Sequence, residues 1–221
     1  ARDAFLCRGT HTLLIVTAHG HAHALPVSTL PHGTRSSRGK RLDEFVKLAL
    51  GDEIVSVSAV DEFSPNRFLV VATRQGQIKR SALSEYGNAR AGGIIAVGLN
   101  RGDEVVSAFL TDGETDLVFA ARSGQAIRFP ETAIRPTGRT ARGVKGIDLS
   151  DGDVVVGVMA PRADGDLLAA TTSGYAKRIP FTELKTQGRA GKGLNIVPDL
   201  PEADQLVGLL EVHAGDHIAW E

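Results

Sequence analysis

The sequence predicts an all-β fold, a propeller-like disc of four-stranded blades, and three observations support that prediction. A Gly-Asp turn before a β-branched run recurs along the 221 residues, at spacings of 51, 50 and 51; Ala203-Asp204 replaces it in the last repeat. A second series of glycines closes a short apolar run in every repeat. No stretch keeps the 3.6-residue period of an amphipathic helix. Strand-rich repeats of this length are typical of propellers, in which each sheet buries its faces against its neighbours.

Each repeat starts with a predicted β-hairpin. Its first strand is a short apolar run, followed by a glycine that permits a tight turn. The second strand ends six residues after that glycine at a proline, which cannot donate to a ladder; Ala82 replaces it in the second repeat. The first strands are 13–18, 68–73, 116–121 and 166–171, the glycines Gly20, Gly76, Gly124 and Gly174, and the prolines Pro26, Pro130 and Pro180.

A Gly/Arg-rich loop, an extended stretch, the Gly-Asp turn and a further strand, such as 53–60 or 104–111, complete each unit. Residues 42–50 have the pattern of one or two helical turns. We expect one β domain, or a fragment of one, over 1–221. Its units are 11–60, 67–111, 116–161 and 166–212, with partial blades at 1–10 and 213–221.

The composition excludes several classes of protein. A hydrophobic fraction of 42% supports a buried core, and the 5% of aromatic residues favours blades packed with Val, Leu, Ile and Ala. A single cysteine, Cys7, excludes an internal disulfide and a cysteine-based zinc site, and fits a reducing cytosol. No apolar run approaches 18 residues, so we predict no membrane span. We also expect no signal peptide, and Met159 as the sole methionine predicts that the chain is a fragment.

The Gly/Arg-rich loops 33–41, 86–93, 135–146 and 185–193 are the candidate functional site. They hold 12 cations and no acid. Glycines let a backbone approach a partner and expose its N–H groups, while Arg and Lys supply charge, which is what a phosphate backbone requires. With the hairpin cations, the predicted DNA contacts are Arg35, Arg38, Lys40, Arg41, Lys79, Arg80, Arg90, Arg128, Arg135, Arg139, Arg142, Lys145, Lys177, Arg178, Lys185, Arg189 and Lys192.

The alternative is that these loops are only solvated turns. Against it, arginines recur at fixed offsets from the turn glycine, as Arg35, Arg139 and Arg189 do at the fifteenth residue. The net charge of −1 is then a sum over two segregated populations, since many acids lie in the Gly-Asp turns and in links such as 112–114. We predict a basic rim, an acidic remainder and modest affinity for DNA.

The segments RFLVVATRQGQIKRSAL, GRTARGVKGIDLSDGDVVVGV and SGYAKRIPFTELKTQGRAGKG carry a family resemblance that extends over nearly the whole chain. The sequence resembles the C-terminal domain of the A subunits of bacterial DNA gyrase, and the corresponding domain of topoisomerase IV is near kin. The resemblance implies a β-pinwheel whose blades exchange strands and whose rim wraps duplex DNA. It also implies a cytoplasmic, chromosome-associated topoisomerase with an upstream cleavage domain and an ATPase subunit, in a heterotetramer that introduces negative supercoils. No cofactor is implied for this domain.

The sequence departs from the family in its hallmark, a Q-R-R-G-G-K-G box normally found in the first blade. The segment 2–6 resembles the end of a box-bearing blade, so we expect that blade upstream; 213–221 resembles the start of a further one. Loop 135–146 favours gyrase over topoisomerase IV. The nearest match to the box is degenerate and lies in the last complete unit: Gln187, Gly188, Arg189, Ala190, Gly191, Lys192 and Gly193.

Other candidate sites are weaker. His19, His21 and His23 alternate, as metal ligands on one strand face do, but Gly20 places the first two at a turn. His23 stands where Lys79 and Lys177 stand in other repeats, so we predict a surface or DNA-facing role and no metal. No serine lies in a G-x-S-x-G context, and the paired carboxylates recur with the turn. We therefore expect no catalytic residue here and the strand-cutting tyrosine upstream.

A function of another class stays open on the residues alone. Propellers built from chromosome-condensation-regulator repeats also have units of about fifty residues and use loops at one end of the disc to bind proteins. In such a protein the basic loops would be incidental.

Overall fold

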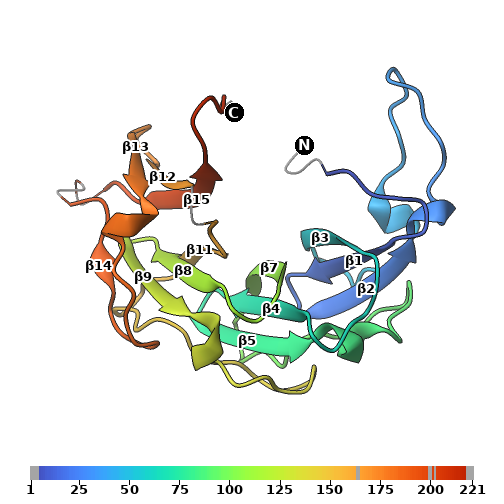
Figure 1. Cartoon of the computed structure of the whole chain (residues 1–221), viewed down its shortest axis with the longest axis horizontal. Coiled ribbons are helices and arrows are strands. Elements are labelled where there is room, and N and C mark those ends of the chain that lie inside the picture. Colours follow the sequence, from blue (N-terminus) through green and yellow to red (C-terminus); the bar gives the residue numbers. More distant parts are fainter. Residues whose placement is uncertain (1–4, 163–164, 199–200, 202, 218–221) are drawn as a thin grey trace.

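The computed structural model describes residues 5–162, 165–198, 201 and 203–217. Within them, four antiparallel sheets stand side by side in an open arc (Figure 1). The predicted all-β class is confirmed. The strands are β1 (Thr12–Thr17), β2 (His21–Pro26), β3 (Ile54–Val60), β4 (Phe68–Thr73), β5 (Gln77–Ala82), β6 (Ile94–Ile95), β7 (Val105–Thr111), β8 (Asp116–Ala121), β9 (Gln125–Pro130), β10 (Val144–Lys145), β11 (Val155–Met159), β12 (Asp166–Thr171), β13 (Ala176–Pro180), β14 (Leu194–Asn195) and β15 (Leu206–Val212).

The sheets exchange strands. Their orders are β3-β1-β2-β6, β10-β5-β4-β7, β11-β8-β9-β14 and β13-β12-β15. The first three blades thus take three strands from their own repeat and a two-residue outer strand from the next repeat. The long strands β3, β7, β11 and β15 contact one another in this order along the concave side, whereas the outer strand β14 lies on the convex side (Figure 1). The exchange implied by the family resemblance is confirmed.

The Gly-Asp turns lock each inner strand to its hairpin. The turn glycine of every hairpin has a φ between 77° and 88°. The aspartate of the Gly-Asp turn then accepts a hydrogen bond from a backbone N–H at that hairpin turn. The donors are His19 N to Asp52 (2.9 Å), Gln75 N to Asp103 (2.9 Å), Ser123 N to Asp153 (3.2 Å) and Ser173 N to Asp204 (2.9 Å). The interpretation of these carboxylates as turn-formers is confirmed.

The core lies between the blades. Leu14 and Val16 of the first blade pack against Leu69 and Val71 of the second, and equivalent aliphatic clusters fill the next two interfaces. The far face of the first blade has no other sheet against it among the described residues. Its apolar side chains pack instead on the chain's own segment 42–50.

Short 3-10 helices direct the chain into the basic loops. The strands β2, β9 and β13 end at Pro26, Pro130 and Pro180, as predicted, and a single helical turn follows each. Segment 42–50 contains one such turn rather than a longer helix. The helices are η1 (Val27–Thr29), η2 (Leu42–Glu44), η3 (Leu83–Tyr86), η4 (Glu131–Ala133) and η5 (Phe181–Glu183).

The two predicted partial blades form no strand where the structure describes them, at 5–10 and 213–217. Residues 2–4, part of the segment that resembles a preceding blade, and 218–221 lie outside the described residues.

Candidate nucleic-acid interface

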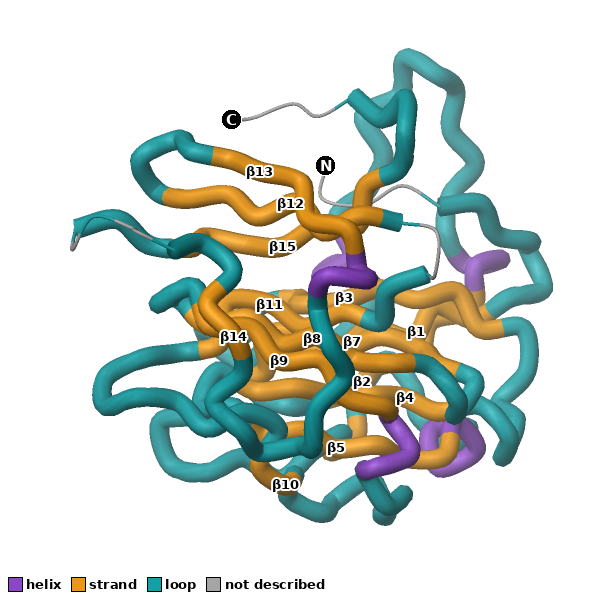
Figure 2. The backbone as a smooth tube through the Cα atoms, turned by 60° about the vertical axis from the view of Figure 1, so that its left-hand side comes forward, coloured by secondary structure: helices purple, strands orange, loops and turns teal. Residues whose placement is uncertain are grey.

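Three of the four Gly/Arg-rich loops follow one another along the convex edge of the arc (Figures 1 and 2). Each lies against the second hairpin strand of the preceding blade. Arg90 O of loop 86–93 accepts from Ala24 N at 3.3 Å. In the next two loops Thr137 N donates to Arg80 O at 2.9 Å, and Gln187 N to Arg128 O at 2.8 Å. The preceding blade thus holds each loop by its backbone.

The loops are also bonded to one another's outer strands. Gly98 N, just after β6, donates to Ala141 O of the next loop at 3.1 Å. One unit further on, Ala190 N donates to Gly146 O at 2.8 Å, and Asp148 N to Gly191 O at 2.9 Å. The three loops therefore form one continuous hydrogen-bonded rim.

The arginine fifteen residues after the turn glycine has an internal role. Arg139 Nη1 donates to Ile95 O at 3.1 Å, and Arg189 Nη1 donates to Lys145 O at 2.6 Å. Both side chains are half-buried. The fixed offset of these arginines, which the sequence alone attributes to DNA, is explained by their contact with the neighbouring outer strand.

The glycine before each outer strand also has an internal role. A Cβ on Gly193 would overlap Ala126 O, and one on Gly143 would lie 2.7 Å from Ile78 O. On Gly93 it would lie 2.5 Å from the His23 ring. These glycines let the loop approach the preceding blade, and their absence of a side chain is not evidence of a nucleic-acid contact.

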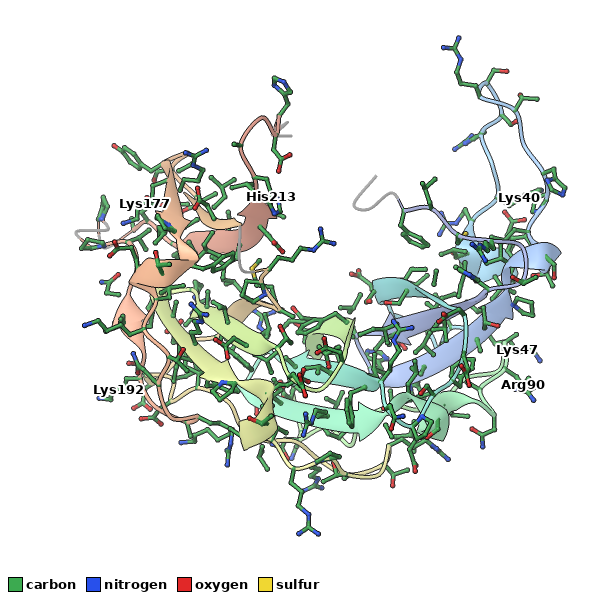
Figure 3. The ribbon with its side chains drawn as sticks, viewed as in Figure 1. Lys40, Lys47, Arg90, Lys177, Lys192 and His213 are labelled. Atoms are coloured by element: carbon green, nitrogen blue, oxygen red, sulfur yellow. The ribbon has the colours of Figure 1, made fainter. Side chains whose placement is uncertain are left out.

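Twelve of the seventeen predicted contacts are exposed, three are half-buried and two are buried. Arg135, Arg142 and Lys185 make no side-chain hydrogen bond or ion pair within the described part of the chain, so their charge is available to a ligand. Figure 3 shows Arg90 and Lys192 on the convex side. The exposed set is Arg35, Arg38, Lys40, Arg41, Arg90, Arg135, Arg142, Lys145, Lys177, Arg178, Lys185 and Lys192.

The first loop differs from the other three. Every residue from 31 to 41 is exposed, and the segment projects from the first blade (Figure 1). Lys40 and Arg41 pair with Glu44 and Asp43 just beyond it.

The prediction of DNA contacts by Lys79 and Arg80 is wrong. Lys79 is 1% exposed, and its Nζ lies 2.5 Å from Ala96 O. Arg80 is 7% exposed, 3.6 Å from the buried Glu131 carboxylate and 4.6 Å from the centre of the Phe68 ring. Both side chains are occupied by protein partners inside the fold.

Arg128 is half-buried and has partners inside the fold. Its Nε donates to Asp116 at 2.8 Å and its Nη1 to Phe181 O at 2.7 Å. Arg178 pairs in the same way with Asp166, at 3.0 Å, although it is exposed. In both repeats the aspartate precedes the arginine by twelve residues, a signal in the sequence that predicts an ion pair across the hairpin.

The box-like motif forms a tight loop at the last described interface between blades. Ala190 has a φ of 67°, the left-handed conformation that favours the glycine found there in the family box. Gln187 N and Ala190 N bond to the preceding blade and its rim loop. Of the two cations in this motif, Lys192 is exposed and Arg189 is half-buried.

The described histidines do not form a metal site. His23 is 3% exposed and its Nδ1 lies 3.0 Å from Ala91 O, so the predicted surface or DNA-facing role is wrong for this residue. His19 and His21 lie 3.7 and 4.0 Å from Asp52. No group of three metal-ligating side chains occurs among the described residues.

The two tyrosines lie in different surroundings. Tyr86 is fully buried, its Oη donates to Ala96 O at 3.2 Å, and burial raises its pKa to about 12. Tyr175 is exposed on the last blade. No helix in the described part of the chain is long and apolar enough to cross a membrane.

Four strand-exchanging blades with basic loops on the convex edge define a β-propeller of the pinwheel kind. A family model described as "DNA gyrase C-terminal domain, beta-propeller" matches residues 11–61, 67–112, 115–162 and 165–213. The chain belongs to this family. The family model describes a C-terminal domain.

Relatives and solved structures agree with this assignment. The DNA gyrase A protein of Salmonella typhimurium is 35% identical over 142 residues, which cover 64% of this chain and 16% of that protein. The gyrase A protein of Kosmotoga olearia is 39% identical over 132 residues, covering 59% and 16%. A solved C-terminal domain of DNA topoisomerase IV matches with a TM-score of 0.86 and 27% identity, over 93% of this chain and 64% of that one. A solved gyrase A C-terminal domain, 17% identical with a TM-score of 0.58, supports the fold; the match covers 93% of this chain and 83% of that one.

Proposed function

We propose that this domain binds and wraps duplex DNA along its convex rim, without reading the base sequence. The observation that supports the proposal is the order of the loops 86–93, 135–146 and 185–193 along one edge. Hydrogen bonds link each later loop to the loop before it or to the segment just after that loop. Each of the three loops presents exposed cations, such as Arg90, Arg142 and Lys192. Cations held along one curved edge can contact the phosphates of a duplex that follows this edge.

The side chains available on the rim favour phosphate contacts. Arg and Lys neutralise phosphates and release counterions, whereas base reading requires side chains inserted into a groove. The loops carry one aromatic residue, Tyr86, and it is buried, so stacking on single strands has no support.

For the whole protein we infer the A subunit of DNA gyrase, a type IIA topoisomerase of the bacterial cytoplasm. In it, an upstream domain cuts DNA, an ATPase subunit completes a heterotetramer, and wrapping by this domain supports ATP-dependent negative supercoiling. The named relatives are gyrase proteins, which supports gyrase over topoisomerase IV. The solved topoisomerase IV domain, at 27% identity, makes that enzyme the second candidate.

The salt dependence of binding tests the proposal. If about six phosphates are neutralised, a plot of log K against log salt for a linear duplex has a slope near −5. Two duplexes of equal length and unrelated sequence should give the same affinity within about twofold. A flat salt response would contradict the proposal and leave the protein-interaction propeller as the better hypothesis.

A second experiment separates wrapping from simple binding. Relaxed plasmid is religated with the domain bound, then freed of protein and resolved on a gel. Wrapping traps writhe, so the linking number shifts with protein added. Stoichiometric binding without a shift would show a DNA-binding domain that does not wrap.

A further inference from the structure

Lys79 is the one lysine buried among the described residues, and its surroundings are unusual for a cation. Its Nζ donates to three backbone carbonyls: Ala96 O at 2.5 Å, Gly138 O at 3.4 Å, and Arg139 O. It makes no ion pair with a carboxylate of the described residues. Two of these carbonyls belong to the basic loop 135–146, and the third follows β6 in the preceding loop's segment. The Lys79 ammonium group therefore joins two consecutive parts of the rim from inside the fold.

In each of the first three blades, the same repeat position lies under the next loop. Three residues after the turn glycine stand His23, Lys79, Ile127 and Lys177. His23 contacts Ala91 O of loop 86–93. Ile127 lies beneath loop 185–193, with its Cδ1 3.4 Å from where a Cβ on Gly191 would be. Lys177 is exposed, and no further loop covers it in the described part of the chain.

Ile127 shows that an apolar side chain fits this position. Burial of an ammonium is costly unless every N–H finds an acceptor, so a lysine here is not the choice that packing alone would favour. The three N–H groups of Lys79 instead match the carbonyls of Ala96, Gly138 and Arg139. The charge thus fixes the path of the backbone on which Arg139 and Arg142 stand.

We propose that Lys79 is a positioning residue for DNA binding, which holds loop 135–146 so that the exposed Arg142 and Lys145 face the duplex. This inference rests on the proposed function. Lys79 itself touches no DNA, because the loop covers it.

The protonation state of Lys79 gives the proposal a pH signature. Burial, and then the Arg139 cation, lowers the pKa of Lys79 to about 7, whereas Glu85 acts in the opposite direction. Tyr86 Oη shares the Ala96 carbonyl. A neutral amine has two N–H donors and leaves one carbonyl without a partner, but it also avoids the cost of burying a charge. Because the docked loop lowers the pKa of Lys79, opening the loop takes up a proton, so docking becomes more favourable as pH rises above 7.

Fold stability should move in the same direction over the same range. An unfolded lysine keeps its proton up to a pKa of about 10.4, so the unfolded state binds more protons than the folded state between about pH 7 and 10. This group then adds stability as pH rises. A fall in affinity above pH 7 therefore cannot come from Lys79, either through unfolding or through release of the loop.

The test uses Lys79→Ile, which reproduces the residue of the third blade, and measures duplex affinity together with thermal unfolding. We expect the variant to fold and to bind DNA about tenfold more weakly, as expected when two phosphate contacts lose their fixed position. In a domain that already carries Arg142→Gln and Lys145→Gln, Lys79→Ile should have no further effect. An equal loss in both backgrounds, or no loss in either, would overturn the proposal.

The matched control is Lys177→Ile, which removes a charge from the same repeat position where no described loop lies above it. Its effect on affinity should be the same with and without the two glutamine substitutions. Between pH 6 and 8 the affinity of Lys79→Ile should also change less than that of the parent domain, and the histidines common to both cancel in the comparison.

Hydrogen exchange gives a readout that needs no DNA. In the parent domain the amides of Thr137 and Ala141 should gain protection as pH rises above 7, after correction for the intrinsic rate. Unchanged protection would overturn the proposal even if Lys79→Ile did not fold. If the parent domain itself bound no DNA, the proposed function would be wrong. The exchange result would still show whether Lys79 holds loop 135–146.

Discussion

Loops 33–41 and 135–146 occupy the same place in their repeats and carry four cations each, yet the structure treats them differently. The later loop is bonded to the blade before it through Thr137, Ala141 and Lys79. The first loop has only local bonds, chiefly those of Ser37 to Thr34. After it, the chain forms η2 and covers the face of its own blade instead of adding an outer strand. The two loops therefore share their number of cations because they occupy the same place in the repeat. They differ in rigidity because only the later loop is bonded to a neighbouring blade.

The largest expected effect of this difference concerns one glycine in each loop. Gly143→Ala places a Cβ within 3 Å of three backbone atoms of Ile78, so either β5 or the loop must shift. We expect a loss of about 3 kcal/mol in the free energy of unfolding. Gly39→Ala meets nothing within 4 Å, and only its φ of 75° opposes the change, at about 1 kcal/mol. Urea unfolding of the two variants measures both values; equal losses would remove the distinction between docked and free loops.

The second effect concerns DNA affinity at equal charge. Arg142→Gln with Lys145→Gln and Arg35→Gln with Arg38→Gln each remove two exposed cations. Both pairs should reduce the salt slope by about 2. The docked pair should cost about 1.5–2 kcal/mol of binding and the free pair about half of that, because the first loop must be ordered on binding. DNA titrations at two salt concentrations check this. A larger loss of affinity from the free pair would contradict the conclusion that docking to the neighbouring blade makes a loop the stronger DNA contact.

The smallest expected effect is on the stability of the fold at acidic pH, and it involves a residue at the other end of the arc. Burial disfavours the Asp204 carboxylate, but hydrogen bonds from the Thr172 and Thr171 hydroxyls and two backbone amides outweigh it and hold its pKa well below the usual range. In the unfolded state this carboxylate has a pKa of about 3.9 and binds a proton below that pH, whereas in the folded state it stays ionised there. Its stabilisation is complete above that value and is lost as pH falls below it.

Asp204→Asn should therefore lower the midpoint of thermal unfolding at pH 7, and the gap to the parent domain should narrow below pH 4. A gap that stays constant from pH 7 to 3 would show that the carboxylate's charge does not matter at this turn.

Much of the fold follows from local patterns in the sequence. Gly76 and Pro130 mark a hairpin turn and a strand end because each reflects a backbone property of one residue. The burial of Lys79 and His23 could not be found this way, because it depends on a loop about sixty residues further along the chain. That of Arg80 depends on Gly113 and Glu131, which are also distant in the sequence. When one repeat is considered alone, the charged side chains of Lys79 and Arg80 and the imidazole of His23 look like surface groups. The fixed offset of Arg139 correctly predicts a residue of the rim, but not its role, because its side chain donates a hydrogen bond to the Ile95 carbonyl.

The exchange of outer strands means that the unit that repeats in the sequence is not the unit that packs. A cut in the link at residue 113 leaves whole repeats in the sequence but takes β10 away from the second sheet and loop 135–146 away from Lys79. Blades of this domain therefore cannot be added, removed or swapped at repeat boundaries without opening an edge. Any shuffling of its parts must carry each hairpin together with the loop of its successor.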